Sequence, residues 1–229
     1  MKKIVRAVVV FFALSLLGGC ATMSRVGNSN IVLPNDSPTM TFIVGGYQSE
    51  TGYLGSIQVA FPGAKIITPR KYVPISSAAE VLLEKMKAEG WQGQEVVFIA
   101  YSWSGLLCRQ LVKDNPQMKA RIIMIGTPSR SFWFLPEFLF RIEDERPDVP
   151  IFVIAGSGGK GAVPWFLRDG PNDGVVEVSS ALAVNAWAAV VFPLEHHDLL
   201  HAEETIRQMQ AWATMPLPKT LVAAVTVKN

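Results

Sequence analysis

The sequence contains few cysteines, few charges and no apolar run long enough to cross a bilayer. Two of its 229 residues are cysteine and 17% are charged, with a formal net charge of +2. The cysteine count excludes a framework of several disulfides, and the charge excludes an extended basic surface for nucleic acid. Hydrophobic residues make up 49% of the chain, which allows a sizeable core and excludes a disordered protein. The length fits one domain, or at most two small ones.

The N-terminal segment has the composition of a secretory signal. Lys2, Lys3 and Arg6 precede an apolar stretch from Ala7 to Leu17 that contains no acidic residue. This stretch is shorter than the roughly 20 residues that span a bilayer. We therefore expect residues 1–19 to be removed, and without the three basic residues the formal net charge of +2 becomes −1.

The end of this segment, Leu-Gly-Gly-Cys at 17–20, resembles the lipoprotein box of bacteria. The resemblance implies cleavage before Cys20, whose thiol would then carry diacylglycerol and anchor the protein to a membrane. Cys108 would be left unpaired, so no internal disulfide is expected. Ala21 implies sorting toward the outer membrane of a Gram-negative cell, and residues 20–38 are expected to form a tether facing the periplasm. The alternative is an ordinary signal peptide with an incidental cysteine.

Short apolar runs separated by helical stretches predict an α/β domain over residues 39–229, with a mostly parallel sheet flanked by helices. The runs are Met40 to Val44, Lys65 to Thr68, Val96 to Ala100, Ile122 to Ile125, Ile151 to Ala155 and Ala188 to Phe192. The tail from Met215 fits either an edge strand or a loose end.

Three segments predict helices. The capping box Ser-Ala-Ala-Glu at 77–80 predicts a helix start, and Gly90 stands where a C-terminal cap belongs. Ser104 to Lys113 and Glu203 to Ala213 have apolar residues at helical spacing.

The third apolar run leads directly into a serine at a predicted turn from strand to helix. Segment 100–104 reads Ala-Tyr-Ser-Trp-Ser, and the helical pattern begins at once. A serine at so sharp a turn has a strained backbone and a hydroxyl exposed above the carboxyl end of its strand, where functional groups of parallel sheets collect. The turn requires small residues two positions before and two after the serine, as Ala100 and Ser104 are. Ser102 is therefore the candidate nucleophile.

A serine hydroxyl needs a base to remove its proton. The three histidines of the chain, His196, His197 and His201, follow the last apolar run. The order, with serine first and histidine last, resembles that of the α/β-hydrolases. Segment 196–200, His-His-Asp-Leu-Leu, resembles the stretch that carries the catalytic histidine in bacterial lipases and esterases. The resemblance implies that His196 is the base, with His197 as the alternative.

A carboxylate between serine and histidine would complete a catalytic triad. Segment 172–176, Asn-Asp-Gly-Val-Val, resembles the motif in which bacterial lipases place that aspartate, which implies Asp173. Asp169 is the nearest alternative carboxylate, and a plain Asn-Asp-Gly turn is the alternative structure. The resemblance to these lipases and esterases extends from about Thr41 to Ala213.

The developing oxyanion of acyl transfer also needs hydrogen-bond donors. In the family the first is the backbone N–H after the nucleophile, here that of Trp103. Segment 42–47, Phe-Ile-Val-Gly-Gly-Tyr, resembles the loop that supplies the second, with Gly45 in place of the usual histidine. That carry-over implies the N–H of Tyr47, whereas a plain turn at Gly45 and Gly46 is the alternative.

A second lipase-like segment precedes an aromatic cluster. Segment 126–129, Gly-Thr-Pro-Ser, resembles the Gly-Thr-Pro-His of lipases, and aromatic residues crowd positions 132–140. An insertion at this place in the fold predicts a small apolar cap around residues 129–146, suited to an acyl chain or a membrane surface. A helix packed on the core is the alternative.

These patterns predict a lipid-anchored serine hydrolase that cleaves carboxylic esters or lipid-like esters, without cofactor, metal or nucleic acid. Two other functions stay open. His197 and His201, four positions apart with Asp198 between them, have a spacing able to hold zinc in a periplasmic hydrolase. The chain would otherwise be a non-catalytic binding lipoprotein with a hydrolase fold. Segment 156–161, Gly-Ser-Gly-Gly-Lys-Gly, lacks the spacing of a phosphate-binding loop and predicts a flexible loop.

Overall fold

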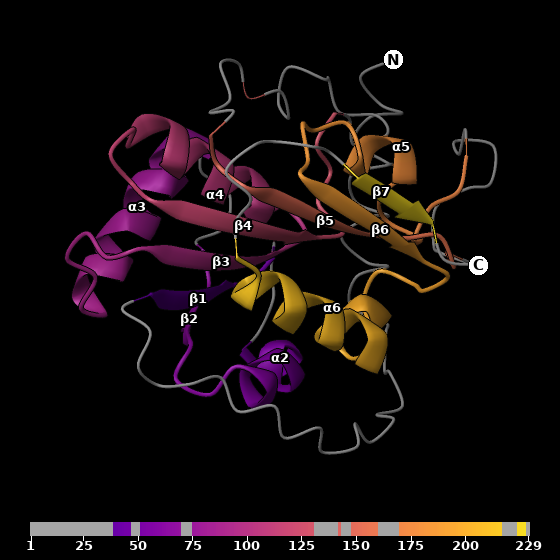
Figure 1. Cartoon of the computed structure of the whole chain (residues 1–229), viewed down its shortest axis with the longest axis horizontal. Coiled ribbons are helices and arrows are strands. Elements are labelled where there is room, and N and C mark those ends of the chain that lie inside the picture. The colour runs from indigo at the N-terminus through magenta and orange to yellow at the C-terminus, as the bar shows by residue number, and fades with distance from the viewer. Residues whose placement is uncertain are drawn as a thin grey trace, which may run out of the picture.

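The computed structural model describes residues 39–46, 51–69, 75–130, 142, 148–159, 170–216 and 224–227. The strands of this part are β1 (Met40–Val44), β2 (Lys65–Ile67), β3 (Val96–Tyr101), β4 (Ala120–Ile125), β5 (Ile151–Gly156), β6 (Ala188–Phe192) and β7 (Ala224–Val227). Its helices are α2 (Gly55–Ala60), α3 (Ile75–Ala88), α4 (Ser104–Asp114), α5 (Val178–Ala181) and α6 (Glu203–Thr214), with 3-10 turns η1 (Thr51–Leu54) and η4 (Asp198–Leu200) (Figure 1).

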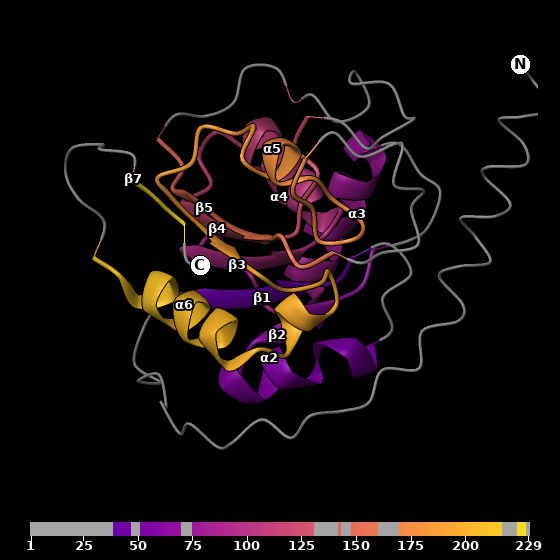
Figure 2. The same cartoon turned by 90° about the vertical axis from the view of Figure 1, so that its right-hand side faces the viewer.

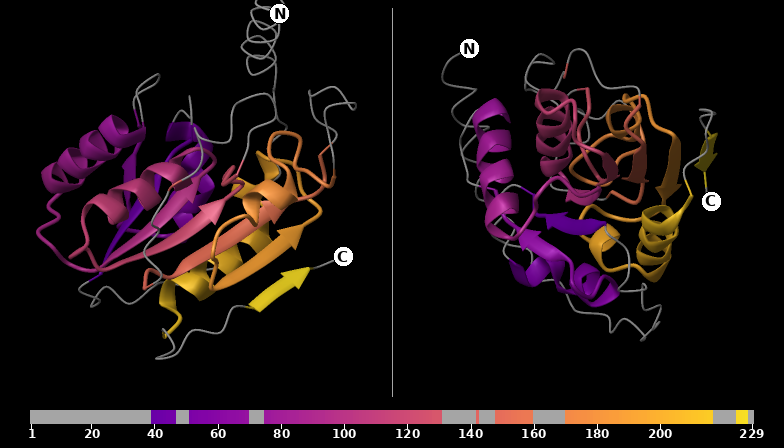
Figure 3. Two further views of the ribbon diagram at one scale, coloured as in Figure 1. Left: turned by 90° about the horizontal axis from the view of Figure 1, so that it is seen from above. Right: turned by 60° about the vertical axis from the view of Figure 1, so that its left-hand side comes forward.

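The strands form one parallel sheet in the order β2-β1-β3-β4-β5-β6-β7 (Figure 3). The chain first moves outward from β1 to β2 and then returns to add every later strand on the other side of β1. The direction of winding therefore reverses between β1 and β3. In open parallel sheets the crevice at such a reversal, beyond the carboxyl ends of the strands, is where ligands bind.

Helices cover both faces of the sheet. Figure 2 shows α3, α4 and α5 on one face and α2 and α6 on the other. Because side chains of a strand alternate between faces, Phe98 and Ala100 pack toward α3 and α4, whereas Ile99 and Tyr101 pack toward α2 and α6. All six residues of β3 are buried, which explains why the strand is a continuous apolar run in the sequence.

The strand predictions are confirmed to within two residues at each end. β1 and β6 have the predicted bounds, and β4 begins two residues before the predicted Ile122. For the tail from Met215 the sequence allowed an edge strand or a loose end. The tail contains the edge strand β7, which is parallel to β6. The helices predicted from Ser104 and Glu203 are confirmed as α4 and α6.

The predicted start of α3 is wrong, but its predicted end is confirmed. Ser77 lies inside the helix, which begins at Ile75, and Ile75 packs against the core. Packing this partly buried side chain against the core favours three further residues of helix, 75–77, over a cap at Ser77. At the other end Gly90 has φ +95°, its N–H donates to the carbonyl of Lys87, and the N–H of Trp91 donates to that of Met86. These two bonds form a Schellman cap.

In the described part of the chain, no helix has the length and apolar character needed to span a bilayer. The predicted signal peptide (1–19) and tether (20–38) lie outside the described residues, as does most of the predicted cap around residues 129–146.

Candidate active site

Ser102 occupies the turn between β3 and α4. Among the described residues it is the one non-glycine residue with positive φ, at +55°. Left-handed backbone is strained for a residue with a Cβ and is retained where the surrounding structure enforces it. The Ser102 N–H donates to the carbonyl of Ile125 at 2.7 Å, and the Gly105 N–H donates to the carbonyl of Ser102. The serine therefore lies at the carboxyl end of β3, beside the end of β4, and is half-buried.

Three small residues allow the neighbouring chain segments to approach this turn. A Cβ added at Gly46 would lie 3.0 Å from the Cβ of Ser102, and one at Gly105 would lie 2.2 Å from Oγ1 of Thr127. Ser104, predicted only to be small, has its Oγ 2.7 Å from the carbonyl oxygens of both Val44 and Tyr101. Its hydroxyl thus links the ends of β1 and β3 across the reversal in the sheet.

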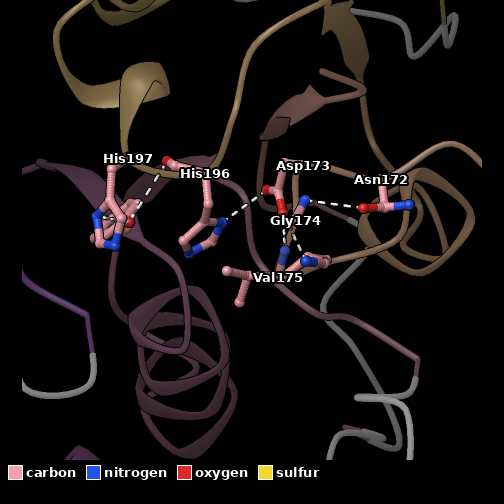
Figure 4. Close-up of polar contacts among 8 residues, drawn as sticks. Asn172, Asp173, Gly174, Val175, His196 and His197 are labelled. Atoms are coloured by element: carbon pink, nitrogen blue, oxygen red, sulfur yellow. Dashed lines mark hydrogen bonds and ion pairs between the residues drawn. The ribbon is translucent and has the colours of Figure 1, made fainter. Parts of the chain in front are cut away.

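Asp173 and His196 contact each other in a buried hydrogen bond. His196 Nδ1 lies 2.7 Å from Asp173 Oδ2, and the two side chains are 5% and 1% exposed (Figure 4). The His196 N–H also donates to the carbonyl of Asp173 at 2.8 Å. Backbone and side chain of the histidine are therefore both fixed by the same aspartate.

The Asn-Asp-Gly segment is a turn that also orients the carboxylate. Asp173 Oδ1 accepts from the N–H groups of Val175 at 2.9 Å and Val176 at 2.6 Å. The side-chain oxygen of Asn172 accepts from the N–H of Gly174, whose φ of +94° favours glycine. Because the turn uses Oδ1, Oδ2 is left to face the imidazole. The plain turn proposed as an alternative is present, and it holds Asp173 against His196.

The glycine-rich segment that begins with Gly156, the last residue of β5, is packed between the two loops that carry Asp173 and His196. A Cβ on Gly156 would lie 2.6 Å from the Cβ of Asp173, and one on Gly158 would lie 2.6 Å from the carbonyl oxygen of Pro193. The N–H of Gly159 donates to the carbonyl of Asn172 at 2.8 Å. Residues 157–159 form a loop as predicted, Gly156 belongs to β5, and the flexibility of the loop stays a prediction, while 160 and 161 lie outside the described residues.

Gly126 leaves room for the ring of His196 at the end of β4, the strand next to the one that carries Ser102. It has φ +55°, and an added Cβ would lie 2.8 Å from Cε1 of His196 and 3.1 Å from Oδ2 of Asp173. Gly126 directly follows Ile125, whose carbonyl accepts the N–H of Ser102. The structure thus gathers the predicted serine, histidine and aspartate at the carboxyl ends of β3, β6 and β5.

His197 and His201 point to different partners. Nδ1 of His197 lies 3.0 Å from the hydroxyl of Tyr101, and Nδ1 of His201 lies 3.0 Å from Oγ of Ser56. The residues between them form the 3-10 turn η4, so the shared α-helical face assumed for a zinc pair is wrong. Over the described ranges no group of three His, Cys, Asp or Glu side chains is arranged to hold a metal ion.

Burial controls the ionisation of the side chains around His196. The pKa of Tyr101 is raised well above 10.0, first by burial and then by the charge of Asp173. The pKa of His197 is lowered from 6.5 by burial and by the neighbouring His196 and His201. At neutral pH the phenol is therefore protonated and the His197 ring is neutral.

The remaining predicted residues are only partly described. Trp103 has helical dihedrals and directly precedes α4, so its N–H lies at the helix N-terminus next to Ser102. Gly45 donates its N–H to the carbonyl of Ile67 at the end of β2. Tyr47, the predicted second oxyanion donor, and Asp169, the alternative carboxylate, lie outside the described residues, as do Cys20 and the aromatic positions 132–140.

Sequence reasoning gave Gly126, Gly156 and Tyr101 no role in placing the site residues. Gly126 and Gly156 each stand at the end of a predicted strand, which was the available signal, because a glycine there allows a side chain to cross the strand end. The contact of Tyr101 with residues 95 and 96 positions away has no local signal.

No protein-family model and no curated protein matches the sequence. Solved structures do match. Lipase BlEst2 of Bacillus licheniformis in its propeptide form is 16% identical, over 85% of this chain and 54% of the lipase, with a TM-score of 0.61. A gene product of Listeria innocua is 14% identical, over 82% and 97%, with a TM-score of 0.59. A lipase-esterase related protein of Clostridium acetobutylicum is 11% identical, over 79% and 97%, with a TM-score of 0.56.

At these identities the likeness shows a shared fold. The parallel sheet with helices on both faces is the α/β-hydrolase fold, and the predicted fold class is confirmed.

The lowered pKa values of His197 and His201 predict a pH-dependent stability. Burial is the largest cause for both, so in the folded chain each binds its proton below pH 6.5, whereas in the unfolded chain each binds it near pH 6.5. Between pH 7 and the folded pKa values, the unfolded state therefore binds more protons than the folded state. The free energy of unfolding falls as the pH falls through this range.

Urea unfolding at several pH values between 7.5 and 5, with NMR titration of the imidazole signals, measures this effect. His201→Asn should show a smaller loss of stability than the wild type over the same range, because one of the two groups is gone. Equal losses in both proteins, or folded pKa values at or above 6.5, would contradict the prediction.

Proposed function

We propose that this chain is a serine hydrolase that cleaves carboxylic esters through a covalent acyl-enzyme. The observation that carries the proposal is the half-buried Ser102 at φ +55° at the carboxyl end of β3, with the buried Asp173–His196 hydrogen bond at the same edge of the sheet, at the ends of β5 and β6. Esterases and lipases with the same fold support this class of reaction.

In this mechanism the Oγ of Ser102 attacks the ester carbonyl while Nε2 of His196 takes the hydroxyl proton. The tetrahedral intermediate then expels the alcohol, which receives that proton from His196. A water molecule, deprotonated by the same nitrogen, attacks the acyl-serine, and the second tetrahedral intermediate releases the acid as His196 returns the proton to Oγ of Ser102. Asp173 Oδ2 accepts the Nδ1–H of His196, which leaves the lone pair on Nε2 and stabilises the imidazolium.

His196 is favoured over His197 as the base because of what each Nδ1 faces. His196 faces a carboxylate at 2.7 Å, which attracts the positive charge that the base acquires. His197 faces the phenol of Tyr101 at 3.0 Å in a partly buried contact, although its side chain as a whole is exposed to solvent. A neutral phenol supplies no such compensation.

The N–H of Trp103 is the proposed first donor to the oxyanion. It lies at the N-terminus of α4, where backbone N–H groups and the helix dipole favour negative charge. We propose the N–H of Tyr47 as the second donor, since β1 ends at Val44 and Gly46 approaches Ser102 directly. The aromatic positions 132–140 favour an ester with an apolar acyl group.

The sequence also supports a membrane anchor for this enzyme. We propose that Cys20 carries lipid after cleavage of residues 1–19, and that residues 20–38 tether the domain to the outer membrane on its periplasmic side. Such an enzyme would act next to a lipid surface.

Ser102→Ala tests the nucleophile. Alanine retains the Cβ and so bears the same backbone strain, which should leave stability close to that of the wild type. The value of kcat/KM on a p-nitrophenyl ester should fall by at least about 10³-fold. Ser179→Ala removes an exposed serine and serves as the matched control, with kcat/KM expected to stay unchanged. Turnover near the wild-type rate in Ser102→Ala would contradict the mechanism.

Parallel alanine substitutions at His196 and His197 show which of the two is the base. His196→Ala should lose about as much kcat as Ser102→Ala, because both groups act in one proton transfer. His197→Ala should lose far less. Equal and mild losses in the two variants would refute the choice of His196.

Cys20→Ala tests the anchor in the full chain, expressed in a Gram-negative host. The wild type should sediment with membranes and incorporate labelled palmitate, and Cys20→Ala should do neither. Cys108→Ala is the matched control, because Cys108 is buried in α4 and should not be lipidated. Membrane sedimentation of Cys20→Ala equal to that of the wild type would argue against the anchor.

A further inference from the structure

His196 and Ser102 follow strands that are not neighbours in the sheet. It follows β6, whereas Ser102 follows β3, and β4 and β5 lie between them in the sheet. Neighbouring strands are about 4.8 Å apart, so the ends of β3 and β6 are separated by about 14 Å. The loop after β6 must therefore extend across the ends of β5 and β4 to bring His196 near Ser102. The position of the imidazole then depends on the contacts that fix this loop.

Asp173 holds one side of the loop. Its carbonyl accepts the N–H of His196 at 2.8 Å and its Oδ2 faces Nδ1 of His196 at 2.7 Å. Both contacts come from the segment after β5. They fix the histidine relative to the aspartate, but neither of them fixes it relative to the serine.

Tyr101 contacts the loop from the serine side. It is the last residue of β3, directly before Ser102, and is 3% exposed. Its ring centroid lies 4.9 Å from that of His196. Its hydroxyl lies 3.0 Å from Nδ1 of His197 and 3.5 Å from the carbonyl oxygen of His196. One side chain thus packs against the ring of His196 and binds the residue that follows it.

The ionisation of the two partners allows a hydrogen bond in which the phenol is the donor. The phenol is protonated because burial raises the pKa of Tyr101, and the ring of His197 is neutral because burial lowers its pKa. With a neutral ring, the Nε2–H tautomer of His197 places a lone pair on Nδ1, to which the hydroxyl of Tyr101 can donate at 3.0 Å, closer than the carbonyl oxygen of His196 at 3.5 Å.

We propose that Tyr101, through its hydrogen bond to His197, is a positioning residue that sets the distance and orientation between His196 and Ser102. The inference rests on the proposed function and adds to it two residues that take no part in bond making or proton transfer. Because Tyr101 and Ser102 are consecutive, a displacement of the end of β3 moves the serine and this hydrogen bond together. Errors of about 1 Å in such geometry cost up to about 10²-fold in rate.

A double-mutant cycle tests the proposal. Tyr101→Phe keeps the ring against His196 but removes the hydroxyl, and His197→Ala removes the acceptor. Each should lower kcat about tenfold with KM unchanged, because the reacting geometry is disturbed and substrate binding is not. The double variant should also lose about tenfold and not about a hundredfold, since both changes break one bond. His197→Asn, whose amide oxygen can accept in place of Nδ1, should restore most of kcat.

Ser56→Ala is the matched control. Ser56 and His201 form the same kind of hydroxyl–imidazole contact at the same 3.0 Å. His201 lies four positions after His197 in the chain. Its loss should change kcat by less than about twofold. The unfolding temperature of every variant, and the tautomer of His197 read from the imidazole nitrogen NMR shifts, show whether the fold and the hydrogen bond are as described.

The outcomes separate this inference from the proposed function. Full kcat in Tyr101→Phe and His197→Ala, with turnover lost in Ser102→Ala, would overturn the positioning role and leave the serine mechanism standing. A hundredfold loss in the double variant, or a wild-type His197 that lacks the Nε2–H tautomer, would overturn the role of the bond. Turnover in the wild type that does not depend on Ser102 would overturn the proposed function and the inference with it.

Discussion

A buried carboxylate is stable only if hydrogen bonds replace the water that it loses, and in this chain that requirement organises the site. Asp173 receives two backbone N–H groups on Oδ1 and faces the imidazole of His196 with Oδ2. The glycines at 156 and 159 leave the space that the Asp173 turn occupies. Changing any of these partners would leave charge buried without compensation, and so the turn, the glycine segment and the histidine loop depend on one another.

The topology explains why these groups meet where they do. Winding reverses between β1 and β3, and the hydroxyl of Ser104 joins the ends of these two strands. Gly46 approaches Ser102 from β1, and Gly126 lies under the His196 ring at the end of β4. Glycine at these strand ends lets loops from distant parts of the sheet converge within van der Waals distance of the strained serine, which larger residues would prevent.

Local patterns in the sequence predicted the strands because buried parallel strands are continuous apolar runs, and they singled out Ser102 at the end of one run. The resemblance to lipase motifs pointed to Asp173 and His196. The catalytic roles of these three residues stay predictions. The start of α3 was mispredicted because the packing of the partly buried Ile75 against the core, a tertiary effect, outweighs the cap at Ser77. The packing of Gly158 against Pro193 and the bond between Tyr101 and His197 join residues 35 and 96 positions apart, and such contacts leave no periodic or compositional trace.

The central claim is that Ser102 is an activated nucleophile, and labelling of the purified domain with a fluorophosphonate probe tests it most directly. Wild type, Ser102→Ala and a chelator-treated wild-type sample are compared, with circular dichroism to show that each is folded. The account predicts labelling that survives chelation and disappears in Ser102→Ala. A folded wild type that takes up no label, or a Ser102→Ala variant labelled as strongly as the wild type, would contradict it.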